Sequence, residues 1–433
     1  MSSSKSLSTA AVLVATLSLA ACGTGDATTA DSGGGSAPAS GGIKGGPGID
    51  VAAKTIRIGD ISALSGPVAV LGEPLSAGRR AYFKQLNASG GIDGWKIKLT
   101  TKDSGYQPQQ HVQQYTAVSK EIAILNSLGS PTTKAIQAQI DRDKLVTFPA
   151  SFDSIWGADP QMAPIGTPYS YDLANLLDYY VASVSKKPKI GLIYANDEYG
   201  ADGRRGYDAA QESLGFEDVG QLSYKTGDTD FTGQVQKLKS AGAEGVVLVT
   251  TPSATGPIVG TAASLGFTPQ WLLQGPAFLE QLITKDGSSG AKATPVAAAL
   301  KGALVTSFAA PWGAKDVDGM ADMIAAHDKY TPDQPPSIYY TVAYAQGKVQ
   351  AELLRKAIAA GDLSRAGLLT AKENLGEVDL DGLTSNPTFT PEGGPPSTKS
   401  LITQIDPGVE GFLKPLEPAH GSKAADGLEI PES

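Results

Sequence analysis

The chain has 433 residues, enough for two domains of ordinary size, and 41% of them are hydrophobic. Its formal net charge is −9, which argues against a nucleic-acid partner, because binding to phosphates needs a basic surface. Cys22 is the single cysteine, so the chain cannot form an internal disulfide.

The N-terminal segment has the pattern of an export signal. A short positively charged start precedes Leu7–Leu19, an apolar stretch too short to span a bilayer comfortably. The motif Leu19-Ala20-Ala21-Cys22 then resembles a bacterial lipobox. That resemblance implies a lipoprotein signal peptide over residues 1–22, with a lipid on Cys22 that anchors the mature protein outside the cytoplasmic membrane. Residues 23–53 are rich in Gly, Ser, Ala and Thr, and we expect a flexible tether there.

From Lys54 onward, strand and helix patterns alternate. In the first part the pattern predicts strands at 56–61, 95–99, 122–128 and 145–148, with helices at 74–87, from 108, and through 136–140. The second part predicts a helix at 171–184, one that follows the loop 196–200 and closes near Gly215, one at 231–238, one that ends at 265–266, and two at 318–330 and 337–360. It predicts strands at 189–194, 245–249, 271–273, 302–308 and 401–405. Residues 417–433 have little apolar content and are expected to be loose. The alternation indicates α/β architecture with parallel sheets covered on both faces.

Several short motifs resemble the branched-chain amino-acid (Leu/Ile/Val-binding) family of ABC-transporter solute-binding proteins. They are Leu64-Ser65-Gly66-Pro67, Leu71-Gly72, the run 86–94, Asp197-Glu198-Tyr199-Gly200, Asp230-Phe231 and Ser264-Leu265-Gly266-Phe267. The resemblance implies a type I periplasmic-binding-protein fold: two Rossmann-like parallel-sheet lobes joined by a three-crossing hinge. Lobe 1 would hold residues 54–168 and 305–398, and lobe 2 residues 169–304 and 399–416. Ligand would be trapped between the lobes by hinge closure.

The same resemblance implies a set of ligand-binding positions. Ser130 and Thr132 match a hydroxyl pair that holds the ligand carboxylate, and Ser130 would cap the helix that follows. The plain alternative is that both residues only cap that helix. The other positions are Leu71, Ser151, Phe152, Tyr199, Thr251 and Ala277.

Ala277 departs from the family pattern. Amino-acid-binding members carry an acid at this position, which pairs with the ligand ammonium. An unpaired buried ammonium costs several kcal/mol. Either Asp103, Asp153 or Glu280 replaces that acid, or the ligand is not an α-amino acid. We favour the second: a carboxylate or amide with an apolar or aromatic body.

The sequence-based function is therefore an extracytoplasmic, lipid-anchored solute-binding protein that delivers its ligand to an ABC permease. The main alternative is a sensor of the same fold that signals to a membrane receptor, and a structural surface protein is a less favoured third. An enzyme is not expected, because His111, His327 and His420 do not follow strands. We expect a monomer, with no metal and no cofactor.

Overall fold

The computed structural model describes residues 42–184 and 186–431. The predicted signal peptide, Cys22 and the first part of the predicted tether lie outside these residues. Within the described residues, no helix combines the length and apolar character that a membrane span requires.

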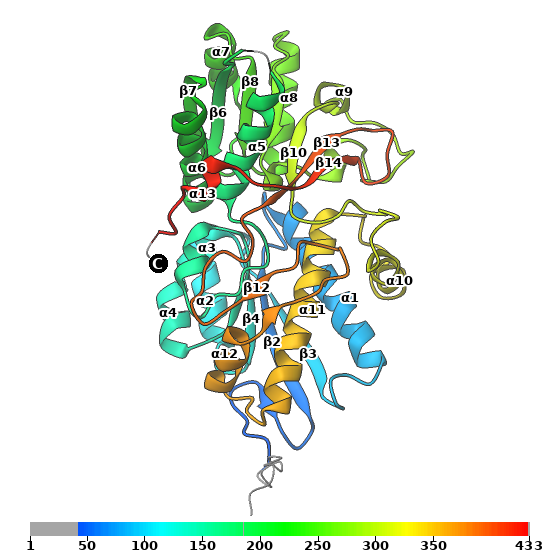
Figure 1. Cartoon of the computed structure of the whole chain (residues 1–433). Coiled ribbons are helices and arrows are strands. Elements are labelled where there is room, and N and C mark those ends of the chain that lie inside the picture. Colours follow the sequence, from blue (N-terminus) through cyan, green and yellow to red (C-terminus); the bar gives the residue numbers. More distant parts are fainter. Residues whose placement is uncertain (1–41, 185, 432–433) are drawn as a thin grey trace, which may run out of the picture. The chain divides into compact units, whose positions relative to one another are not determined.

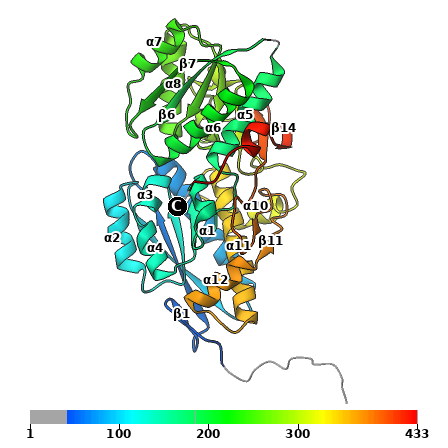
Figure 2. The ribbon, with the colours of Figure 1, turned by 60° about the vertical axis from the view of Figure 1, so that its left-hand side comes forward.

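Lobe 1 is built on a five-stranded sheet in which β2, the first long strand, is central. β2 pairs in parallel with β3 and β4, and β4 pairs in parallel with β5. Helices α2 to α4 lie on one side of this sheet and α1 and α11 on the other (Figures 1 and 2). The elements of this lobe are β1 (Ile49–Asp50), β2 (Thr55–Ser62), α1 (Ala69–Ala88), β3 (Lys96–Asp103), α2 (Pro108–Val118), β4 (Ile124–Leu128), α3 (Ser130–Lys134), α4 (Gln137–Asp143), β5 (Thr147–Ala150), the short helix η1 (Ser154–Ala158), α10 (Met320–Tyr330), α11 (Ile338–Ala359), α12 (Arg365–Glu373), β11 (Gly376–Glu377) and β12 (Thr388–Phe389).

Lobe 2 is built on a seven-stranded sheet in the order β14-β13-β10-β9-β8-β6-β7. The five strands β7, β6, β8, β9 and β10 run parallel, whereas β13 and β14 are antiparallel to their neighbours. Helix α5 packs on α6, and α7 packs on α8. The elements are α5 (Tyr169–Ser183), β6 (Lys189–Ala195), α6 (Glu198–Leu214), β7 (Glu217–Tyr224), α7 (Thr232–Ser240), β8 (Gly245–Val249), α8 (Pro252–Ser264), β9 (Gln270–Leu273), η2 (Gly275–Ala277), η3 (Glu280–Leu282), α9 (Ala297–Leu300), β10 (Leu304–Ser307), β13 (Ser400–Ile405), β14 (Leu413–His420) and α13 (Lys423–Asp426).

The two lobes are joined by three chain crossings (Figure 1). The first precedes α5 at Pro168, the second follows β10, and the third precedes β13. These are the crossings that the resemblance implies. The second crossing lies slightly later than predicted, because residues 305–307 still pair with β13 in the sheet of lobe 2.

Lobe 1 owes its tight packing to close contact between α1 and α11. A Cβ at Gly78 would lie 2.4 Å from the Tyr340 carbonyl oxygen, so only glycine lets the two helices approach this closely. Arg79 adds a buried link, since its guanidinium donates to Asp60 Oδ1 at 2.7 Å and to Gln346 Oε1 at 2.7 Å. β2, α1 and α11 are therefore held as one body beside the cleft.

The structure corrects the predicted tether at its end. Residues 49–50 form β1, which pairs antiparallel with the start of β2. The Lys44 amide donates to the Gly361 carbonyl at 2.9 Å. The compositional signal for flexibility was misleading here, because Gly48 lets the chain approach closely: a Cβ there would lie 2.3 Å from the Ala123 amide nitrogen. The compact lobe thus begins before residue 54.

The predicted loose tail is also wrong within the described residues. Leu413–His420 forms β14 along β13, and α13 packs on α5 and α6. β14 is rich in polar residues because it is an edge strand, which needs apolar side chains on one face only. β7, α12 and β14 were not predicted. α1 begins at Ala69, before the predicted start, with Pro74 inside the helix.

Candidate functional site

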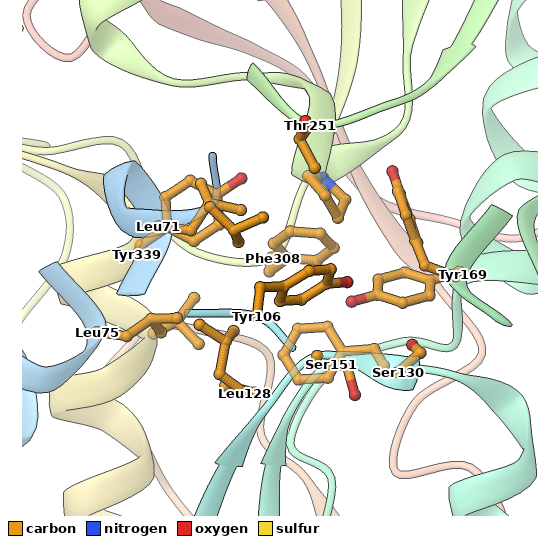
Figure 3. Close-up of a pocket in the computed structure, with 17 residues that line it drawn as sticks. Leu71, Leu75, Tyr106, Leu128, Ser130, Ser151, Tyr169, Thr251, Phe308 and Tyr339 are labelled. Carbon is orange, nitrogen blue, oxygen red and sulfur yellow. The ribbon is translucent and has the colours of Figure 1, made fainter. Parts of the chain in front are cut away.

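One pocket lies between the lobes, where the carboxyl ends of strands from both sheets face each other (Figure 3). This is the edge at which α/β folds bind ligands. The segments after β2, β3, β4 and β5 contribute from lobe 1, and those after β6, β8, β9 and β10 from lobe 2. The lining residues are Val68, Leu71, Leu75, Tyr106, Leu128, Gly129, Ser130, Ala150, Ser151, Phe152, Tyr169, Tyr199, Thr251, Pro276, Phe308, Tyr339 and Val342.

The cavity is small in this conformation, about 50 Å³. For comparison, an apolar cavity of roughly 150 Å³ binds benzene. A ligand with an apolar body can therefore enter only if the lobes separate or the lining side chains move.

Aromatic rings fill the centre of the pocket. The ring of Tyr169 lies 4.8 Å from that of Tyr199 and 6.2 Å from that of Phe152, measured between centroids. Phe308 packs edge-on against Phe152 at 5.1 Å. Such arrangements stabilise by dispersion and ring electrostatics. They give the site a strongly apolar wall that joins both lobes.

Two of the tyrosine hydroxyls are already occupied by the protein. Tyr199 donates to Gln274 Oε1 at 2.8 Å, and Tyr339 donates to the Phe278 carbonyl at 3.0 Å. Burial raises the pKa of both phenols above the ordinary value, so both stay protonated. Neither proton is free for a ligand.

Two serines on lobe 1 present hydroxyls to the pocket. Ser130 Oγ is buried and forms no hydrogen bond of ordinary geometry within residues 42–184 and 186–431, and it lies beside the Asp153 carboxyl, whose pKa is raised by burial and lowered in part by this hydroxyl. Ser151 Oγ accepts from Trp156 Nε1 at 3.0 Å, which leaves the Ser151 proton available. Both serines follow strand ends, β4 and β5, and lie near each other on the pocket floor (Figure 3).

Gly129 shapes this floor. Its φ of +98° is a conformation that only glycine adopts readily, and a Cβ there would lie 2.4 Å from the Tyr106 ring. Gly129, rather than Ser130 as predicted, precedes α3 as its N-cap. Ser130 instead starts the helix, and the Tyr106 ring lies against this turn. In Figure 3 the hydroxyls of Tyr106 and Tyr169 point toward the same part of the pocket.

The structure brings six of the eight predicted ligand-binding residues to the pocket: Leu71, Ser130, Ser151, Phe152, Tyr199 and Thr251. Their role in binding stays a prediction. Thr132 and Ala277 do not line it. The Thr132 hydroxyl donates to the Leu128 and Gly129 carbonyls, and α3 has no side-chain cap, so Thr132 does not have the capping role of the plain alternative either. Ala277 is fully buried behind Pro276, in η2.

None of the three candidate substitute acids lines the pocket. Asp103 accepts from the Leu64 and Gly105 amides and from Ser65 Oγ, so it holds two loops together. Asp153 accepts from the Ile155 amide at 3.2 Å, and burial followed by the charge of Asp202 raises its pKa well above the ordinary value. Glu280 accepts from the Ile338 amide at 2.7 Å, and burial raises its pKa to about 8.

Sequence reasoning missed several lining residues, among them Tyr106, Tyr169, Phe308 and Tyr339. Tyr106 follows β3 in a left-handed turn with φ of 60°, and Phe308 directly follows β10. The position of Tyr106 and Phe308 just after strand ends was a usable signal, because ligands bind at that edge of the sheet. Across the described residues, the lining includes no Asp, Glu, Lys, Arg or His.

Comparisons with known proteins agree with this architecture. Residues 55–410 match the family described as periplasmic binding protein. The Leu/Ile/Val-binding protein homolog 7 of Brucella abortus is 25% identical over 319 residues, 70% of this chain and 78% of that protein. An amino acid binding protein of Pseudomonas aeruginosa is 26% identical over 246 residues, 54% of this chain and 63% of that protein. The match thus spans less than two thirds of the Pseudomonas protein.

Solved structures give the same result. A fatty acid ABC transporter substrate-binding protein from Thermomonospora curvata has a TM-score of 0.82 and 29% identity, covering 90% of this chain and 98% of that one. A branched chain amino acid ABC transporter protein from Thermus thermophilus with bound valine has a TM-score of 0.76 and 18% identity, covering 86% and 97%. The resemblance seen in the sequence is confirmed: the chain belongs to the periplasmic binding protein family, whose Leu/Ile/Val-binding type comprises substrate-binding proteins of ABC transporters.

Proposed function

We propose that this protein binds a monocarboxylic acid with an apolar body, of the fatty-acid type, and delivers it to the permease of an ABC importer. The carrying observation is the composition of the pocket: apolar side chains, aromatic rings and hydroxyls, without a charged side chain among the described lining residues.

The lack of a charged partner argues against an α-amino acid. A buried ammonium needs a carboxylate partner, because leaving one unpaired costs several kcal/mol. A carboxylate is easier to accommodate, since several neutral donors can share its charge. Ser130 and Ser151 offer two such donors on lobe 1, and each hydrogen bond to a charged group contributes about 1.5–3 kcal/mol.

The remaining wall suits an alkyl chain. Leu71 and Leu75 of α1 and Val342 of α11 line the pocket together with Leu128, the last residue of β4. Each buried CH₂ of a ligand contributes about 0.8 kcal/mol. The similarity to the Thermomonospora fatty-acid protein supports the same class, because it extends over nearly the whole of both chains.

Anchoring and delivery complete the proposal. A lipid on Cys22 would hold the protein at the outer face of the cytoplasmic membrane, beside its permease. Closure of the two lobes on the ligand would create the surface that the permease recognises. The family membership and the predicted lipobox support this part.

A thermal-shift panel tests the ligand class. It compares octanoate, octanamide, octylamine and leucine on the full chain with Cys22→Ser. We expect octanoate to raise the unfolding midpoint by a few degrees at saturating concentration, because ligand at about 100 times its dissociation constant adds roughly 2.7 kcal/mol. Octylamine and leucine should not shift it. A shift with leucine or octylamine alone would contradict the proposal.

A further inference from the structure

The two lobes meet at one edge of the pocket through a buried carboxylate. Asp202, in α6 of lobe 2, accepts hydrogen bonds from the amide of Ser154 at 3.0 Å and from its hydroxyl. Ser154 begins η1 of lobe 1. Asp202 also accepts from the Ser170 amide at 3.3 Å, at the start of α5. This carboxylate therefore ties lobe 1 to the first crossing.

Arg205, one turn later on α6, completes the arrangement. Its Nη2 donates to Ser154 Oγ at 2.6 Å and to Ser170 Oγ at 3.0 Å, and lies 3.2 Å from Asp202 Oδ1. Charge-assisted hydrogen bonds of this kind are about twice as strong as neutral ones. We call Ser154, Ser170, Asp202 and Arg205 the interlobe latch.

The C-terminal segment braces the latch. The Glu429 carbonyl accepts from Arg205 Nη1, and the Leu428 carbonyl accepts from the Tyr171 hydroxyl at 2.7 Å. Ile430 lies against η1, since its Cδ1 is only 3.1 Å from where a Gly157 Cβ would be. A segment held on lobe 2 thus touches lobe 1 beside the latch.

The latch is connected to the pocket through a short piece of chain. Ser151 and Phe152 line the pocket, and Ser154 follows two residues after Phe152. The Phe152 carbonyl accepts from the Tyr169 amide at 2.8 Å. In addition, α3, which begins with Ser130, packs against α6. Asp202 itself does not line the pocket. It can influence a ligand only through the wall that it holds.

We propose that Asp202 is a positioning residue: it latches the closed lobes and fixes the Ser151–Ser154 wall, and so sets ligand affinity without touching the ligand. The affinity part rests on the proposed function. The latch itself rests only on the contacts between the lobes.

Asp202→Asn tests this assignment. Asparagine keeps the size of the side chain, but it removes the charge and turns an amide group toward either Ser154 or Arg205. The matched control is Asp208→Asn on the same helix, whose exposed carboxylate pairs with Arg204 at 3.5 Å. The dissociation constant and dissociation rate of octanoate are measured for both variants. The separation of the lobes is measured between spin labels at Gln109→Cys and Glu212→Cys, two exposed positions on α2 and α6, with Cys22→Ser.

We expect Asp202→Asn to weaken octanoate binding about tenfold, mainly through faster dissociation, and to broaden the ligand-free distance distribution. Asp208→Asn should change neither. Unchanged affinity in Asp202→Asn would overturn the positioning role. If the wild-type protein binds no carboxylate, the proposed function fails. The spin-label distances then test the latch by themselves: identical distance distributions in Asp202→Asn and Asp208→Asn would overturn it.

Discussion

The two lobes contribute different chemistry to the same pocket. Lobe 1 supplies Ser130 and Ser151, whose hydroxyls lie on the pocket floor. Lobe 2 supplies Tyr199, whose hydroxyl donates to Gln274, and Thr251, whose hydroxyl shares a hydrogen bond with Ser253 in which either can be the donor. Lobe 2 also supplies Tyr169, whose hydroxyl points into the pocket (Figure 3). Lobe 1 is therefore the main recognition wall, and lobe 2 is a mainly aromatic cover.

This difference has a consequence for the order of binding. A ligand that meets the open protein can make its hydrogen bonds to Ser130 and Ser151 on lobe 1 before lobe 2 closes. Closure of lobe 2 then adds apolar burial and excludes water, which strengthens the hydrogen bonds already made. Lobe 1 thus offers both the head-group donors and the aliphatic wall, and the closure of lobe 2 adds aromatic burial of the ligand.

The contacts between the lobes should respond to pH at Glu280. Its folded-state pKa of about 8 lies above the ordinary unfolded value of about 4.3, because the carboxyl is fully buried. The folded state then holds more protons across this window, so unfolding becomes easier as pH rises from about 4.3 to about 8. We expect the unfolding midpoint of the wild type to fall relative to Glu280→Gln by at least about 2 °C over this range.

Glutamine can keep the hydrogen bond from the Ile338 amide, and it does not titrate. Calorimetry of both proteins at pH 5, 6.5 and 8 measures the difference. If the unfolding midpoints of the two proteins change with pH in the same way, the titration of Glu280 does not contribute to stability, and this prediction is wrong.

A smaller effect is expected at Tyr199. Its hydroxyl donates to Gln274 and does not face the ligand as a free donor, so Tyr199→Phe removes a contact within lobe 2. Octanoate affinity should fall less than about threefold, by titration calorimetry, since one neutral hydrogen bond contributes about 1 kcal/mol to the fold rather than to binding. A loss of tenfold or more would make lobe 2 a recognition wall as well.

The polar half of this site could be predicted from the sequence. The run Ser130-Pro131-Thr132-Thr133 after a buried strand indicated hydroxyls at a helix start, and Ser130 does line the pocket. The sequence pattern could not tell which of Ser130 and Thr132 lines the pocket, because the exact start of the helix decides which hydroxyl faces it. Gly129, by its positive φ, shifted the helix start by one residue and turned Thr132 toward carbonyls instead.

The aromatic half was harder to predict. Tyr169 and Phe308 lie at chain crossings, where the ligand-facing direction depends on how two lobes are joined and not on any local period. The polar edge strand β14 was not predicted for a related reason. It is a strand because it pairs with β13, and nothing in its own composition indicates one. Fold and crossings follow from repeated βα units, whereas contacts between units require the assembled structure.

The most direct test of the recognition wall is octanoate binding to Ser130→Ala and to a matched control, Ser76→Ala. Ser76 Oγ is likewise buried without a partner among the described residues, but it lies on α1 outside the pocket lining. Titration calorimetry should show at least about a tenfold loss for Ser130→Ala, from one hydrogen bond of about 1.5 kcal/mol or more to a carboxylate, and an unchanged affinity for Ser76→Ala. Equal affinities for both variants and the wild type would contradict the assignment of carboxylate recognition to lobe 1.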